Sequence, residues 1–279
     1  MRIFRATLDG RAALAYELDG RLVALDVAPD GLGALEGALQ FDPAGAPAGH
    51  DLGPVSQAAL LAPVAPSKVV AIGLNYRDHI LESGAEAPPR PLVFAKFPSS
   101  VVGPTDPIVI DRAVTQRVDW EVELAVVVGR TMRRVSETDA LDYVAGYTVA
   151  NDVSARDVQF GDGQWVRGKS LDTFCPLGPC LVTPDEFGDP QDKGLWTRVN
   201  GETMQASNTS KMLFGVAELL SFCSHSFTLD PGDIVLTGTP WGCGEFMSPV
   251  RSLQAGDVVE SEVEGIGTIV SPVEELAPD

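Results

Sequence analysis

The chain has 279 residues, of which 44% are hydrophobic and 21% are charged, so it can bury the core of one large domain or of one large and one small domain. Its 20 Lys and Arg against 39 Asp and Glu give a formal charge of -19, which disfavours nucleic acid and anionic membranes as partners, because both repel an acidic surface.

No apolar run approaches the roughly 18 residues needed to cross a bilayer. The N-terminus also lacks the apolar core of a signal peptide, so we expect a cytoplasmic protein. The four cysteines form no CxxC pair, and we expect neither a zinc site nor a disulfide framework.

The N-terminal segment is predicted to be a small β-meander. Residues 2–8, 12–18 and 21–27 have strand character and are separated by Asp9-Gly10 and Asp19-Gly20, dipeptides that suit tight hairpin turns. A stretch rich in Gly, Ala and Pro follows from residue 29 to residue 66, with helical pieces expected near 32–40 and 55–61. We therefore expect a small domain at 1–65 and a larger one at 66–279.

The larger domain is predicted to be mostly β with interspersed helices. Strands are expected at 68–73, 108–111, 121–128, 144–149, 233–237 and 257–263. Helices are expected at 76–83, 136–142 and 210–222. Strands and helices do not alternate regularly as in a doubly wound sheet, so the predicted fold class is α+β.

The sharpest local signal is a pair of carboxylates on one strand. Glu121 and Glu123 lie two residues apart and therefore on the same face of a strand that is apolar on both sides. Two like charges buried side by side are unfavourable unless a cation or protons neutralise them. Asp152 ends a second strand and could supply a third oxygen ligand. Three carboxylates without nearby Cys or His suit magnesium, manganese or calcium; the alternative is that both glutamates sit at a solvated strand end.

A candidate general base lies at the start of a predicted helix. Glu82 is three residues after His79 and on the same helical face. A carboxylate beside an imidazole fixes its tautomer and raises its basicity, as the activation of water requires. The alternative is a His-Glu pair on a solvated helix. The other two histidines, His50 and His225, are expected to be structural or solvated.

Residues 163–170, GQWVRGKS, match the phosphate-binding pattern GxxxxGK[ST]. A P-loop is rejected because no hydrophobic strand precedes the pattern, and because Pro176 and Pro179 follow where a helix is required. Lys169 nevertheless remains a candidate for stabilising an enolate oxygen, against the commoner role of a solvated lysine.

Taken together, these segments resemble the fumarylacetoacetate hydrolase family from about Lys68 to Val273. The pieces that match include Gly73-Leu74-Asn75-Tyr76 with His79 and Glu82, Lys96 with Pro98-Ser99-Ser100, Glu121-Val122-Glu123, Gly146-Tyr147-Thr148, residues 151–157 (NDVSARD), residues 168–174 (GKSLDTF), Pro176-Leu177-Gly178-Pro179, Val199-Asn200-Gly201-Glu202, Pro231-Gly232-Asp233 and Thr237-Gly238-Thr239-Pro240. Each piece is weak alone, but chance does not explain so many in the same order.

The resemblance implies a mixed β-roll catalytic domain, usually in homodimers, with a divalent metal at the positions of Glu121, Glu123 and Asp152. It also implies that His79, oriented by Glu82, activates water. Contacts with the substrate are implied for the positions of Tyr76, Gln159, Lys169 and Thr239. The N-terminal meander differs from that of the fumarylacetoacetate enzyme itself, which leaves the substrate open.

The leading hypothesis is therefore a magnesium- or manganese-dependent hydrolase that cleaves a carbon-carbon bond of a 2,4-dioxo acid of the acylpyruvate type. The metal and Lys169 would stabilise the departing enolate, and the His79-Glu82 pair would deliver hydroxide. Decarboxylation of oxaloacetate or isomerisation of a 2-hydroxymuconate-type diacid would use the same metal site. A module that only binds a cation and an anionic ligand is a third alternative.

Overall fold

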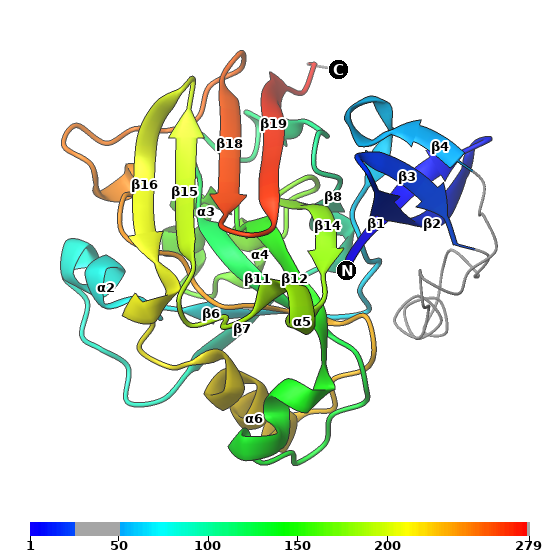
Figure 1. Ribbon diagram of the computed structural model, residues 1–279. Helices are drawn as coiled ribbons and strands as arrows, with labels where there is room; N and C mark the ends of the chain where they lie inside the picture. Colours follow the sequence, from blue (N-terminus) through cyan, green and yellow to red (C-terminus); the bar gives the residue numbers. More distant parts are fainter. Residues whose placement is uncertain (26–50, 278–279) are drawn as a thin grey trace.

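The computed structural model describes residues 1–25 and 51–277 and has a mixed α+β fold that consists mostly of strands (Figure 1). The predicted fold class is thereby confirmed. The helical piece expected near residues 32–40 lies outside the described residues. In the described part of the chain, no helix is long and apolar enough to cross a membrane.

The three predicted N-terminal strands are present as β1 (Arg2–Leu8), β2 (Arg11–Leu18) and β3 (Arg21–Ala24), with residues 26 and 27 of the third outside the described residues. Two strands that were not predicted, β4 (Asp51–Pro54) and β5 (Leu60–Leu61), join them. Positive φ angles at both residues of Asp9-Gly10 and of Asp19-Gly20 are those that a two-residue hairpin with right-handed strand twist requires. The expected helix at 55–61 is wrong. A 3₁₀ turn at Val55–Gln57 is followed by β5, whose backbone pairs with β1, so sheet pairing replaces the helix.

The rest of the chain adds fourteen strands and five helices to the described part. The strands are β6 (Val69–Gly73), β7 (Leu92–Lys96), β8 (Val101–Val102), β9 (Ile108–Ile110), β10 (Val118–Asp119), β11 (Val122–Val128), β12 (Val144–Asn151), β13 (Ser154–Ala155), β14 (Cys175–Val182), β15 (Gly194–Val199), β16 (Glu202–Asn208), β17 (Ile234–Leu236), β18 (Val258–Val263) and β19 (Gly267–Glu275). The helices are α2 (Arg77–Ser83), α3 (Arg156–Asp162), α4 (Val166–Lys169), α5 (Pro184–Phe187) and α6 (Val216–Ser226).

All six strands expected after residue 65 are present within a residue or two at their ends, and the helix expected at 76–83 is α2. The segment 136–142 forms a 3₁₀ helix, Glu137–Tyr143, in place of an α-helix. The helix expected at 210–222 begins later, at Val216, after a short 3₁₀ helix at Thr209–Lys211. Asn75 binds the backbone between these helices: its main-chain oxygen accepts from Leu213 N, and its side-chain oxygen accepts from Phe214 N.

A large sheet with the strand order β4-β3-β2-β1-β14-β12-β11-β17-β6-β7 runs through the molecule. A second sheet, β16-β15-β18-β19-β9, lies at the top of the view in Figure 1, with the meander at the right. β1 pairs with β14, where Arg2 lies opposite Val182, so the meander continues the large sheet. The division at residue 65 remains a prediction.

Strand β11 lies between β12 and β17 and is buried along its whole length. Val122, Leu124, Val126 and Val128 pack in one hydrophobic cluster, whereas Ala125 and Val127 pack in another. This two-sided burial was predicted from the apolar alternation. It follows that polar side chains at the beginning of this strand enter the interior of the protein and not a solvated edge.

Candidate active site

Three carboxylates converge where β11 begins and β12 ends. Val122 pairs with Asn151 in these antiparallel strands, so the residues just outside this pair, Glu121 and Asp152, become neighbours. Asp152 N donates to Glu121 O at 2.8 Å. Glu121, Glu123 and Asp152 are 5%, 1% and 0% exposed, and each offers an oxygen within 4.8 Å of the other two. The alternative of a solvated strand end is therefore excluded.

Two buried lysines hold the Asp152 carboxylate. Lys169 Nζ donates to Asp152 Oδ2 at 2.7 Å and to Glu121 Oε2 at 2.8 Å. Lys96 Nζ donates to Asp152 Oδ1 at 2.6 Å. Lys169, at the end of α4, was predicted for this site. Lys96 had only been noted as part of a matching motif. The sequence did offer a signal for its role: Lys96 ends the apolar run LVFAK, where a charged side chain needs a buried partner of opposite charge.

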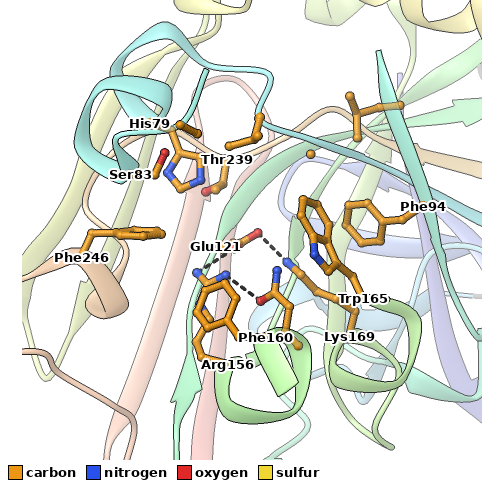
Figure 2. Close-up of a pocket in the computed structure, with 15 residues that line it drawn as sticks. His79, Ser83, Phe94, Glu121, Arg156, Phe160, Trp165, Lys169, Thr239 and Phe246 are labelled. Carbon is orange, nitrogen blue, oxygen red and sulfur yellow. Dashed lines mark hydrogen bonds and ion pairs between the residues drawn. The ribbon is translucent and has the colours of Figure 1, made fainter. Parts of the chain in front are cut away.

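A buried arginine, Arg156, completes the charge network (Figure 2). Its guanidinium pairs with Glu121 Oε1 at 2.7 Å and with Asp119 Oδ2 at 2.8 Å, and it donates to Gln159 Oε1 at 3.0 Å. Sequence reasoning assigned no role to this arginine. It directly follows β13 (Ser154–Ala155) and begins α3, so only a short stretch of chain separates it from Asp152.

The electrostatics of the three carboxylates fit a divalent cation. Burial alone would raise the pKa of Glu121, but Lys169 and Arg156 outweigh it and lower that pKa to about 2. The pKa of Glu123 is instead raised well above its usual range by burial and by repulsion from Asp152 and Glu121. Glu123 accepts one hydrogen bond, from Gly238 N at 2.6 Å, and lacks a cationic partner among the described residues. A hard cation would supply that missing positive charge.

The distances are compatible with this interpretation. Oxygens that bind one ion at 2.0–2.6 Å can lie up to about 5 Å apart, and the three carboxylates meet this condition. Their all-oxygen donor set suits magnesium, manganese or calcium and not a thiolate-preferring metal.

His79 and Glu82 form the predicted pair on α2. His79 Nδ1 lies 2.8 Å from Glu82 Oε1, and Gly242 N donates to Glu82 Oε2 at 2.8 Å, so the carboxylate is fixed from both sides. Because a carboxylate only accepts hydrogen bonds, the tautomer of the neutral imidazole that fits this contact has its proton on Nδ1 and its lone pair on Nε2. His79 is 7% exposed, which excludes the alternative of a solvated helical pair. Cys243 Sγ lies 3.9 Å from His79 Nδ1, and burial raises the pKa of this thiol well above its usual value.

One member of the pair, His79, and one member of the carboxylate cluster, Glu121, line the same cavity of about 240 Å³, whereas Glu82, Glu123 and Asp152 are not on its wall (Figure 2). Five of the predicted residues line it: His79, Glu121, Gln159, Lys169 and Thr239. The apolar part of its wall comes from Ile72, Leu74, Phe94, Phe160, Trp165 and Phe246.

Two of the predicted substrate contacts have restricted side chains. Thr239 Oγ1 donates to Val122 O at 3.0 Å and accepts from Gln205 Nε2 at 2.9 Å. Tyr76 is fully buried and does not line the cavity. Burial, followed by the charges of Glu123 and Asp78, raises the pKa of its phenol well above 10. Tyr76 therefore lies behind the wall of the site.

With this geometry established, comparison with known proteins identifies the family. Residues 68–274 match the model of the fumarylacetoacetate (FAA) hydrolase C-terminal domain. The chain belongs to the fumarylacetoacetate hydrolase family. It is therefore an enzyme, and the resemblance recognised in the sequence is confirmed.

Relatives within the fumarylacetoacetate hydrolase family carry different activities in their names. The chain is 51% identical over 221 residues to a mitochondrial oxaloacetate tautomerase of Xenopus laevis, covering 78% of this chain and 69% of the relative. It is 53% identical over 203 residues to a 2,4-didehydro-3-deoxy-L-rhamnonate hydrolase of a Sphingomonas species, and this alignment covers 72% of this chain and 71% of the relative. The solved structure of a fumarylacetoacetate hydrolase from Exiguobacterium antarcticum aligns with a TM-score of 0.86 at 40% identity and covers 99% of this chain and 100% of that one.

Proposed function

We propose that this enzyme hydrolyses a carbon-carbon bond of a 2,4-dioxo acid of the acylpyruvate type and releases pyruvate and a carboxylic acid. The observation that carries the proposal is the position of His79 and Glu121 on the wall of one cavity. The His79 imidazole and the Glu121 carboxylate would thus face the same substrate. The hydrolase and tautomerase relatives support a keto acid as the substrate class.

Glu121, Glu123 and Asp152 are the residues proposed to hold Mg²⁺ or Mn²⁺. When bound there, the cation would supply Lewis-acid stabilisation of negative charge on the 2-oxo acid. Lys169 remains protonated beside these anions: burial would lower its pKa, but Asp152 and Glu121 outweigh burial and raise it. Its ammonium group can therefore donate to the 2-oxo oxygen as charge develops there. Gln159 and Thr239 are proposed to contact the rest of the substrate, whereas Tyr76 would act from behind the wall.

His79 is proposed to be the general base. Nε2 takes a proton from water while the water oxygen adds to the distal carbonyl carbon, C4. The bond between C3 and C4 then breaks, and its electron pair moves to C3 and forms the enolate of pyruvate. The imidazolium returns the proton to C3, so one water is consumed for each pyruvate and carboxylic acid formed. Glu82 keeps the imidazole in the tautomer that this sequence requires.

A second candidate is keto-enol isomerisation of oxaloacetate, favoured by the Xenopus laevis relative. In this reaction His79 would move a proton at C3, and no water would be added. Both reactions need the cation and Lys169, so only product analysis separates them.

The test is to incubate the purified enzyme with acetylpyruvate, fumarylpyruvate and oxaloacetate, each with Mg²⁺, with Mn²⁺ and with chelator. We expect cation-dependent release of pyruvate from an acylpyruvate, lost in His79→Ala. Faster decay of enol-oxaloacetate without pyruvate release would establish the tautomerase instead. Pyruvate release from oxaloacetate alone would indicate decarboxylation, and no turnover of any of these acids would contradict the proposal.

We also propose a cytoplasmic homodimer, as the composition and the family resemblance suggest. Light scattering coupled to size-exclusion chromatography tests the dimer: a mass near 59 kDa, twice the 29.5 kDa of the chain, is expected, and a monomeric mass would contradict it.

A further inference from the structure

One end of the cavity is formed by two aromatic side chains in contact. The rings of Trp165 and Phe94 meet edge to face, with centroids 5.3 Å apart and planes at 74°. Figure 2 shows them across the site from His79 and Phe246. Phe246 itself packs against the His79 ring at 5.6 Å and lies 5.9 Å from the Arg156 guanidinium, so that side is already occupied by groups in mutual contact. On the opposite side Lys169 Nζ lies 5.3 Å from the centroid of the Phe94 ring, whereas no charged group of the described residues stacks on the Trp165 indole, so this indole offers an apolar surface to a substrate tail.

The position of Trp165 is determined by its surroundings. A Cβ built on Gly73 would lie 2.4 Å from Trp165 Cζ3, so the indole occupies space that only a glycine leaves open. Trp165 also precedes α4, and its carbonyl accepts from Lys169 N at 3.0 Å. The same short turn therefore carries the end wall and the lysine that contacts the carboxylates.

A second hollow of about 260 Å³ lies beyond this wall. It is lined by Leu92, Val93, Phe94, Gly163, Gln164 and Trp165. Phe94 and Trp165 line both spaces, so these two side chains separate them. Leu92, Gly163 and Gln164 are exposed, and the second hollow thus opens to solvent.

The charges around the wall favour a neutral tail. Arg156 and Lys169 are the Arg and Lys residues on the cavity wall, and both are already paired with buried carboxylates. The residues that line the second hollow carry no charged side chain. A second carboxylate at this end would be desolvated beside an ammonium group, that of Lys169, which Asp152 and Glu121 already neutralise, so its burial is unfavourable.

We propose that Trp165 is the specificity-determining residue of the acyl subsite: it selects 2-oxo acids with a short, uncharged acyl tail and blocks entry of longer tails into the second hollow. This inference rests on the proposed function, because it assumes that the 2-oxo acid group lies at the carboxylate cluster. To that function it adds the chemical class of the acyl tail that the enzyme accepts and the residue that limits the length of this tail.

The experiment measures kcat/KM for a series of acylpyruvates, from acetyl to octanoyl, in the wild type and in Trp165→Ala. In the wild type we expect kcat/KM to fall roughly tenfold or more for each methylene beyond the wall. Trp165→Ala should move the optimum to longer tails and weaken the shortest substrate several-fold, because the indole contact is lost. Trp165→Phe, which keeps an aromatic wall, and Phe97→Ala, an exposed aromatic off the cavity wall, should keep the wild-type profile.

Calorimetric titration with N-alkyl oxamates, which present the 2-oxo acid group but are not cleaved, gives a readout that does not depend on turnover. In the wild type, Mg²⁺-dependent binding should favour N-methyl over N-hexyl oxamate, and Trp165→Ala should reverse that order. N-propyl oxamate should also bind the wild type at least tenfold more tightly than N-oxalylglycine, which carries a second carboxylate.

An unchanged length preference in folded Trp165→Ala overturns the inference, as does equal binding of N-oxalylglycine or no binding of any oxamate. If Trp165→Ala does not fold, Trp165→Leu replaces it in the same comparison. Failure of the proposed function has a different signature: no acylpyruvate would be cleaved by the wild type, while the oxamate titrations would still decide the role of Trp165.

Discussion

Lys96 Nζ lies 2.6 Å from Asp152 Oδ1, and both side chains are completely buried. Lys96→Met removes a charged hydrogen bond to the buried Asp152 carboxylate and leaves Lys169 as its remaining cationic partner. The substitution should therefore lower the free energy of unfolding by about 1.5 to 3 kcal/mol, measured by urea denaturation. Arg198→Gln, which breaks a partly exposed pair with Glu262, should change it by at most about 1 kcal/mol. A similar loss in both variants would show that the buried lysine has no special role.

The His79-Glu82 pair should control the rate of the chemical step. We expect His79→Ala to lower kcat about 10²- to 10⁴-fold, because the general base is lost. Glu82→Gln should have a smaller effect in the same direction, since its amide can still accept from Gly242 N but no longer holds a carboxylate against Nδ1. His225→Ala is the matched control, because that histidine is exposed and lies off the cavity wall. Unchanged turnover in His79→Ala with intact cation binding would contradict the proposed mechanism.

Cation affinity should depend on all three carboxylates. Mn²⁺ binding, followed by electron paramagnetic resonance without substrate, should weaken in Glu123→Gln by more than the roughly 10- to 100-fold typical of outer-shell substitutions. Glu121→Gln and Asp152→Asn should weaken it as well. Glu262→Gln, remote on β18, should leave the affinity unchanged. Wild-type affinity in Glu123→Gln would show that this residue is not a ligand.

The lowered pKa of Asp157 predicts that this residue stabilises the fold at neutral pH but not at acid pH. Burial would raise its pKa, but hydrogen bonds from Gln116 N, Thr115 Oγ1 and Val158 N outweigh burial and lower it below 3.8. A lowered folded-state pKa contributes stability that is complete above 3.8 and is lost as the pH falls through the folded value. Urea denaturation should therefore show Asp157→Asn less stable than the wild type at neutral pH. The difference should shrink at a pH of about 3; a constant difference would refute this assignment.

Several features of the site could be predicted because they depend on residues close together in the chain. The spacing of Glu121 and Glu123 determines that they share one face of β11, and the spacing of His79 and Glu82 determines that they meet on α2. The Asp-Gly dipeptides likewise predict the two hairpin turns, because their φ angles are a local property. Local pattern was insufficient at residues 55–61 and 210–215, where pairing with β1 and hydrogen bonds to Asn75 override helical periodicity.

The amino-acid sequence by itself thus determined the fold class, the family and the local pairs Glu121–Glu123 and His79–Glu82 from which the proposed site is built. Only the tertiary structure decided how these groups are neutralised and enclosed. Lys96 reaches Asp152 across 56 residues, and the Trp165 indole lies against Gly73 of β6, a residue distant in the chain. Such contacts depend on which strands lie next to each other in the sheet. That spatial order results from pairing between segments that are distant in the chain, and no local pattern of side chains specifies it.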